Sequence, residues 1–311
     1  MSSNSKYFDQ TNMFLEPKVT QHGSHMVMTD VAMPTKIKHL SIDTRFRDVY
    51  DSSLLADYTI TLPERMNNVR SMEIESIEFP FFLENVSASR GNNCFQLKLG
   101  TNEKTVIIDD GNYTTTTLIT EIQNKINALG SPFDNSGGTG IGFTITNNYA
   151  TFTNNSTTTN CTLVFDKSDC SKPSVSLQSK IGWTLGYRLN EYTIPFGDNK
   201  TGQSIINLNF DPYYFLIIDE FSNANPHSFN APLANSEIST QQIIGRITKP
   251  EGIESTNLLI ADKNQNLIAD VRKYSNEINI QRLRVQIVNP FGKIINNNGI
   301  DFSFCLKFEY L

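Results

Sequence analysis

Residues 39–82 read HLSIDTRFRDVYDSSLLADYTITLPERMNNVRSMEIESIEFPFF, and this stretch decides the fold class. In its last part, apolar side chains mostly alternate with polar ones, as in a strand that has one face in water. The apolar residues are Val69, Met72, Ile74, Ile77 and Phe79. The alternation shifts by one position around Ser76, where a β-bulge would restore it. The stretch predicts a short strand, a polar turn over 43–48 and two further strands, 58–63 and 69–80.

The rest of the chain repeats this pattern of strands and turns. The most apolar run, 213–219, predicts a central strand. Residues 302–310 alternate cleanly and predict a closing strand with one buried face. A strand is also predicted over 204–210. Roughly a dozen such runs, ~8–12 residues apart, indicate an all-β sandwich or barrel.

One helix is predicted, over about 115–129. Apolar residues recur there at helical spacing. They are Leu118, Ile119, Ile122, Ile126 and Leu129. A threonine among 114–116 can cap the start of this helix, and Gly130 lies just past its end.

The first 35 residues lack periodicity and differ from the remainder of the chain. Two interpretations stay open for them: a disordered terminus, or an extended arm that orders against a neighbouring subunit. The predicted organisation is an extended N-terminal arm over 1–35 and a single domain over 36–311.

Composition excludes several classes of function. The net charge is −6 and the pI is near 5.3, so we expect no general attraction to nucleic acid or to an anionic membrane. No run approaches the ~18 consecutive apolar residues of a membrane span, and the N-terminus lacks a signal peptide. We therefore expect synthesis in the cytosol, no transmembrane segment and no nucleic-acid partner.

The four cysteines contain no CxxC pair. Free thiols are the expected state for all four in a cytosolic chain. A bridge between Cys161 and Cys170, which would close a short loop, is the one disulfide that the spacing suggests.

No catalytic, cofactor-binding or metal-binding residue is predicted. The four histidines form no HExxH motif. Asp166 and Asp169 lie close in sequence, but no DxDxDG calcium loop surrounds them. The glycines of 138–142 lack the Lys-Ser/Thr of a phosphate loop and precede a strand. We therefore expect neither enzymatic activity nor a bound cofactor.

Residues of the kinds that anchor protein interfaces are present instead. The candidate interface residues are Arg45, Arg47, Phe81, Phe82 and Trp183. The two arginines lie in the polar turn over 43–48, where they can form local ion pairs or brace a subunit contact. The three aromatic residues can anchor an interface or belong to an ordinary core.

Six segments of the chain, taken in their order along the sequence, carry a resemblance to a known family. They are SIDTRFRD (41–48), YTITLP (58–63), VRSMEIESIEFP (69–80), GNYT…LITEIQNKIN (111–127), IGWTLGYR (181–188) and FCLKFEYL (304–311). Together, and in this order, they resemble the minor capsid and penton-type proteins of nucleocytoplasmic large DNA viruses. The resemblance spans roughly 36–311.

The resemblance implies a jelly-roll β-sandwich, interrupted by the predicted helix, that assembles into an icosahedral shell and catalyses no reaction. The implied partners are other capsid proteins, namely the major capsid protein and neighbouring minor capsid proteins, and also further copies of the chain in a homo-pentamer. The implied location is the virion capsid, assembled in the host cytoplasm. A penton role and a role as cement between capsomers both stay open.

The alternative function is that of a viral fibre or a receptor-binding β-sandwich that attaches to glycans. It predicts aromatic pairs on the surface and measurable sugar binding. In a shell component, the polar loops at 131–142, 166–180 and 221–241 are the candidate contact or outward-facing elements.

Overall fold

The structure is a computed structural model of the chain. It describes residues 34–50, 55–80, 84–166, 176–209, 211–222, 242–249 and 258–311, and the backbone of two strands within the first 33 residues. Strands dominate, and every ladder between them is antiparallel. The predicted all-β class is therefore confirmed. Over the described part of the chain, no helix has the length and apolar character needed to span a bilayer.

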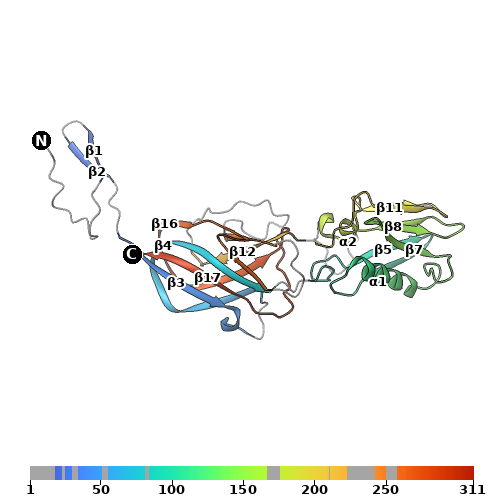
Figure 1. The fold of residues 1–311 in the computed structure, drawn as a ribbon, viewed down its shortest axis with the longest axis horizontal. Coiled ribbons are helices and arrows are strands. Elements are labelled where there is room, and N and C mark those ends of the chain that lie inside the picture. Colours follow the sequence, from blue (N-terminus) through green and yellow to red (C-terminus); the bar gives the residue numbers. More distant parts are fainter. Residues whose placement is uncertain are drawn as a thin grey trace.

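Figure 1 shows two lobes joined by thin connections. The first lobe contains one large sheet, in the order β15-β13-β12-β16-β4-β17-β3, and β14 also pairs with β4. Its strands are β3 (Lys36–Asp43), β4 (Asp57–Pro80), β12 (Tyr213–Asp219), β13 (Ile243–Thr248), β14 (Leu258–Asp262), β15 (Leu267–Ala269), β16 (Arg272–Val288) and β17 (Ser303–Tyr310).

Strand β4 organises the first lobe because it pairs with β16 along its first part and with both β14 and β17 along its second. It replaces the two shorter strands predicted from the sequence. Pro63 does not interrupt it, since Pro63 falls in a gap of the β16 ladder between Thr61 and Met66, where no ladder hydrogen bond is lost. A register shift against β17 leaves Glu75 as an extra residue, so the bulge predicted near Ser76 is present.

This sheet curls around one hydrophobic core. The inward residues of β17, Phe304, Leu306 and Phe308, are at most 1 % exposed. The closing strand predicted from alternation is therefore confirmed. Strand β12 lies between β13 and β16 and is buried over 214–218, as predicted for a central strand.

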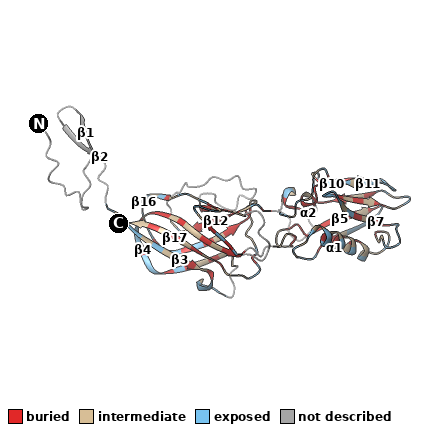
Figure 2. Ribbon diagram, viewed as in Figure 1, coloured by how far each residue is buried: buried red, intermediate tan, exposed pale blue. Residues whose placement is uncertain are grey.

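The second lobe is inserted between β4 and β12. One of its sheets has the order β10-β9-β5-β6 and the other the order β11-β8-β7. Its elements are β5 (Cys94–Leu99), β6 (Asn102–Ile107), α1 (Thr115–Ala128), β7 (Ile141–Thr146), β8 (Tyr149–Asn154), β9 (Cys161–Val164), the 3-10 turn η3 (Leu177–Ser179), α2 (Ile181–Thr184), β10 (Glu191–Ile194) and β11 (Asn199–Thr201). Buried residues gather separately in each lobe, as Figure 2 shows, and the two cores share no residue.

Helix α1 matches its prediction at both ends. Thr114 is its N-cap and forms a capping box with Thr117. Its buried side chains, Leu118, Ile122 and Ile126, follow helical spacing and join the core of the second lobe. Gly130, just past the end, has a φ of 73°, a conformation that glycine adopts without strain.

The predictions for 204–210 and for the N-terminal arm have different outcomes. The backbone of 204–209 is not a strand, because it bonds to two separate segments: Ser204 to Gly186 and Ile206 to Asn148. Within the predicted arm, the described backbone forms one hairpin, β1 (Lys18–His22) and β2 (His25–Thr29). The boundaries of the arm and the single domain over 36–311 stay predictions.

Candidate interface

The turn that follows β3 is fixed by contacts around one carboxylate. Asp43 caps the 3-10 turn η2 (Thr44–Phe46) by accepting a hydrogen bond from the backbone nitrogen of Arg45 at 2.9 Å. The guanidinium of Arg45 donates to the same carboxylate from Nε at 2.9 Å and from Nη2 at 2.5 Å. These bonds hold the pKa of Asp43 below its ordinary value, because they favour the charged carboxylate. The turn thus contains the local ion pair that its sequence allows.

Arg47 braces this turn from the inside. Its side chain is only 6 % exposed. It donates to the carbonyl oxygens of Thr44 and Tyr50, each at 2.9 Å, and lies 3.5 Å from the carboxylate of Asp301. Its planar fork therefore ties both ends of the turn to the segment before β17. An interface role for Arg47 stays a prediction.

The same turn exposes aromatic rings beside further arginines. Phe46 is 72 % and Tyr50 is 58 % exposed. Between them in sequence, the carboxylate of Asp48 lies 3.9 Å from Nε of Arg282 on β16. The guanidinium of Arg282 lies 5.7 Å from the ring centroid of Phe221. We define the guanidinium patch as Arg45, Phe46, Tyr50, Phe221, Arg282 and Arg284.

In the ion pairs of this patch the guanidinium faces water and the carboxylate is sheltered. The exposed fractions are 65 % for Arg45 and 18 % for Asp43, 57 % for Arg282 and 25 % for Asp48, and 45 % for Arg284 and 19 % for Asp57. The outward surface therefore presents N–H donors and aromatic rings. Arginine and aromatic side chains are the types enriched where proteins bind one another.

The predicted aromatic anchor that the structure describes lies apart from the guanidinium patch. Trp183 is half-buried on α2 in the second lobe, and the guanidinium of Arg188 covers its ring at 4.2 Å from the centroid. Phe81 and Phe82 lie outside the described residues. Their neighbour Phe79 is fully buried and belongs to the core of the first lobe. Of the three candidates that the structure describes, Arg45 and Arg47 lie together and Trp183 lies in the other lobe.

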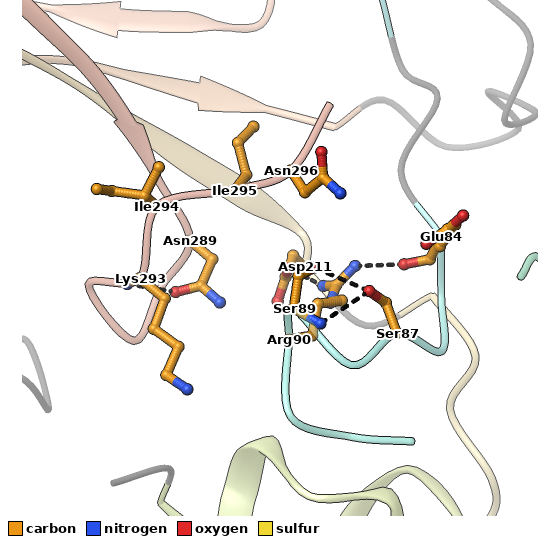
Figure 3. Close-up of a pocket in the computed structure, with 10 residues that line it drawn as sticks. All are labelled: Glu84, Ser87, Ser89, Arg90, Asp211, Asn289, Lys293, Ile294, Ile295 and Asn296. Atoms are coloured by element: carbon orange, nitrogen blue, oxygen red, sulfur yellow. Dashed lines mark hydrogen bonds and ion pairs between the residues drawn. The ribbon is translucent and has the colours of Figure 1, made fainter. Parts of the chain in front are cut away.

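A buried charge pair fixes the junction between the lobes (Figure 3). The guanidinium of Arg90 donates to the carbonyl oxygen of Glu84 at 2.9 Å and pairs with the carboxylate of Asp211, which is 1 % exposed. The hydroxyl of Tyr214 lies 3.5 Å from the same carboxylate, and burial raises the pKa of Tyr214 to about 12. Residues 293–296 of the first lobe line the same small cavity. The two segments that connect the lobes, at Glu84 and at Asp211, thus both contact Arg90.

A second buried pair lies within the first lobe. Nη1 of Arg272 donates to the carboxylate of Glu220 at 2.8 Å and to the carbonyl oxygen of Ile218 at 2.8 Å. Nη2 donates to the carbonyl oxygen of Gln242 at 2.5 Å. Burial raises the pKa of Glu220, and the charge of Arg272 opposes that rise. This pair joins the ends of β12 and β16 to the start of β13.

Sequence reasoning did not find Arg90, Arg272 or Arg282, because each acts through a partner that is distant in the chain. Arg272 stands out in the structure because it is a charged residue that is fully buried in β16. The sequence alone does not reveal that burial. For Arg282, the alternation of β16 predicts an outward side chain but not the neighbouring turn.

The cysteines differ from expectation. Cys94 is disulfide-bonded, so the prediction of four free thiols is wrong. Cys161 is a free, buried thiol, so the suggested bridge between Cys161 and Cys170 is also wrong. Among the residues with described side chains, no group of three or more His, Cys, Asp or Glu residues is placed to hold a metal ion.

Comparisons with known proteins give matches in structure only. No protein family matches the sequence, and no curated protein matches it. The crystal structure of the selenomethionine-labelled mavirus penton protein has a TM-score of 0.45 and 10 % identity, and the match covers 89 % of this chain and 100 % of that one. The cryo-EM structure of the Sputnik virophage has a TM-score of 0.42 and 10 % identity, covering 89 % and 98 %.

Proposed function

We propose that the chain is a structural virion protein, a minor capsid or penton component of the icosahedral shell of a large DNA virus. The observation that carries the proposal is the placement of the segments that bear the resemblance. Segments 41–48, 69–80 and 304–311 contribute to β3, β4 and β17, which are neighbours in one sheet. Motifs far apart in sequence thus form one structural unit, as expected if their order reflects a shared fold.

The surfaces of the first lobe support a role in protein–protein contacts. A shell protein functions through the geometry of its contact surfaces, and these need exposed residues held in a fixed arrangement. The guanidinium patch meets this need, because Arg47 and Asp48 hold its turn rigidly against the sheet. In this proposal the partners are the major capsid protein, neighbouring minor capsid proteins and further copies of the chain.

The remaining organisation follows from the same proposal. Residues 1–35 form an arm that binds a neighbouring capsid protein, and 36–311 form a jelly-roll domain with insertions, of which the second lobe is the largest. The protein is located in the virion, assembled in the host cytoplasm, and has no catalytic activity.

The test is the composition of purified particles. Mass spectrometry of gradient-purified, protease-treated virus particles is expected to find the chain at a fixed ratio to the major capsid protein. Purified chain is also expected to bind shells of the major capsid protein in a co-sedimentation assay. Removal of the chain from particles by the protease treatment, together with specific binding to a glycan array, would instead establish the attachment function.

A further inference from the structure

We propose that the guanidinium patch of one copy docks on an acidic face of a second copy of this chain. The proposal rests on the proposed function, in which identical subunits contact one another in a shell.

The acidic face lies on the outward side of β14 and β4. We define it as Glu75, Glu78, Leu258, Ile260 and Asp262. Ile260 is directly opposite Glu78 in the antiparallel ladder, and Asp262 is opposite Ser76. Leu258 and Ile260 are 56 % and 60 % exposed. Two exposed aliphatic side chains and one acidic side chain therefore line the outward side of β14, beside two glutamates of β4.

The glutamates of this face have no strong cationic partner. Glu78 accepts a hydrogen bond from the hydroxyl of Ser303 at 2.8 Å. Glu75 pairs with His39 at 3.1 Å, and His39 is 56 % exposed. Over the described residues, neither glutamate pairs with a lysine or an arginine. Both carboxylates can therefore accept a guanidinium from another molecule.

The effect of these charges is visible at a neighbouring thiol. Cys305 on β17 is directly opposite Ser76 of β4. Burial raises the pKa of Cys305, and the charges of Glu75 and Glu78 raise it further, because a negative surface disfavours the thiolate. Both glutamates therefore act electrostatically on the centre of this face, whereas the neighbouring Lys263 and Lys307 pair with Glu73.

The two surfaces complement each other in charge and in apolar character. Arg45 and Arg282 extend guanidiniums into water, and each keeps N–H donors beyond those used by its own aspartate. Phe46 and Tyr50 offer apolar area of the kind that Leu258 and Ile260 can cover. Each contact would thus bury both an opposite-charge pair and exposed hydrophobic surface.

The sign of the whole chain disfavours a polyanion as the partner and restricts how two copies can meet. With a net charge of −6, two copies repel each other unless a positive surface of one meets a negative surface of the other. The aspartates beneath the guanidinium patch would also repel the closely spaced phosphates of a nucleic acid. Asp43, which holds Arg45, and Glu78 are both directly opposite Ser303 and therefore project from the same side of the sheet, so two copies facing each other can form the contact twice.

The test uses charge reversal in the full-length chain, with mass measured by sedimentation at several concentrations. Wild type is expected to self-associate, and more weakly at high salt. Arg282→Glu and Glu78→Arg are each expected to weaken association at least tenfold. An equimolar mixture of the two variants is expected to associate, because the unaltered patch of Glu78→Arg meets the unaltered acidic face of Arg282→Glu and the two altered surfaces also have opposite charges. Lys104→Glu is the control, since Lys104 is exposed on β6 of the second lobe.

The outcomes separate this inference from the proposed function. A wild-type chain that stays monomeric, or reversal variants that associate like wild type, would overturn the inference. A mixture that fails to associate although both variants are folded by circular dichroism would also overturn it. If Glu78→Arg does not fold, Ile260→Lys replaces it. Ile260 is exposed, so the lysine should be tolerated by the fold and should weaken association in the same way. A monomeric chain that still binds shells of the major capsid protein would refute only the inference.

Discussion

Replacing Arg272 with methionine should destabilise the first lobe strongly. Both members of its ion pair are withdrawn from water, with side chains 0 % exposed for Arg272 and 4 % for Glu220. Removing one partner of a buried pair leaves an uncompensated charge and costs about 3–5 kcal/mol. The variant also leaves the carbonyl oxygens of Ile218 and Gln242 without this donor. We therefore expect the variant to lose about 3–5 kcal/mol of the free energy of unfolding.

The pH dependence follows from the direction of the pKa shift. The folded-state pKa of Glu220 is raised above its ordinary value of 4.5 by burial. Ionisation of Glu220 in the fold therefore costs stability as the pH rises above that value. In the variant no Arg272 opposes the shift, so the loss of stability should be largest at neutral pH. Below pH 4.5 the carboxyl group is protonated in both states, and the difference from wild type should shrink.

The assay separates the two lobes. The only tryptophan, Trp183, lies in the second lobe, so its fluorescence in a urea titration reports on that lobe, whereas far-UV circular dichroism reports on both. The unfolding transition of the first lobe, which circular dichroism reports and tryptophan fluorescence does not, should move to a lower urea concentration. The double variant Arg272→Met/Glu220→Met should recover part of the loss, and Arg65→Met, at an exposed arginine of β4, is the control. A loss below about 1 kcal/mol for Arg272→Met, or a double variant no more stable than the single, would refute the reasoning.

Three further outcomes concern the second lobe and the thiols. Thr114→Ala should cost about 1 kcal/mol in the fluorescence transition, because α1 loses its N-cap; an unchanged midpoint would contradict this. Gly186→Ala should lower the same midpoint by more than Thr114→Ala, since an added Cβ would meet the carbonyl oxygen of Ser204 in a backbone with a φ of 91°. In native protein a maleimide should label Cys305 before Cys161, because burial raises the pKa of Cys161 to about 12; mass spectrometry that finds Cys161 labelled first would contradict this.

Local features of the fold were predictable because their causes are local. The spacing and caps of α1, the alternation of β17 and the phase shift of β4 all lie within short windows, and the structure has each of them. The continuous strand β4 was not predictable in the same way, since Pro63 and Asn68 read as breaks. They are tolerated because both lie at register shifts where β4 itself has the extra residues, outside the regular ladder with β16.

The sequence did not reveal which strands belong to which of the two cores. Alternation identifies which face of a strand is buried, but it does not reveal which other strands cover that face. The candidate interface was predicted in part for the same reason. The polar turn at Arg45 is visible in the sequence, whereas Arg282 and Phe221 join it only because β16 and the end of β12 lie beside it.

Glu84 and Asp211, where the chain enters and leaves the second lobe, both contact the guanidinium of Arg90. The second lobe is therefore an inserted domain whose two ends lie close together. Excising it and joining the two ends with a short peptide would leave every ladder of the large sheet intact, and a foreign module with neighbouring termini could be grafted in its place. A lineage of such proteins could exchange what it displays there without altering the scaffold beneath.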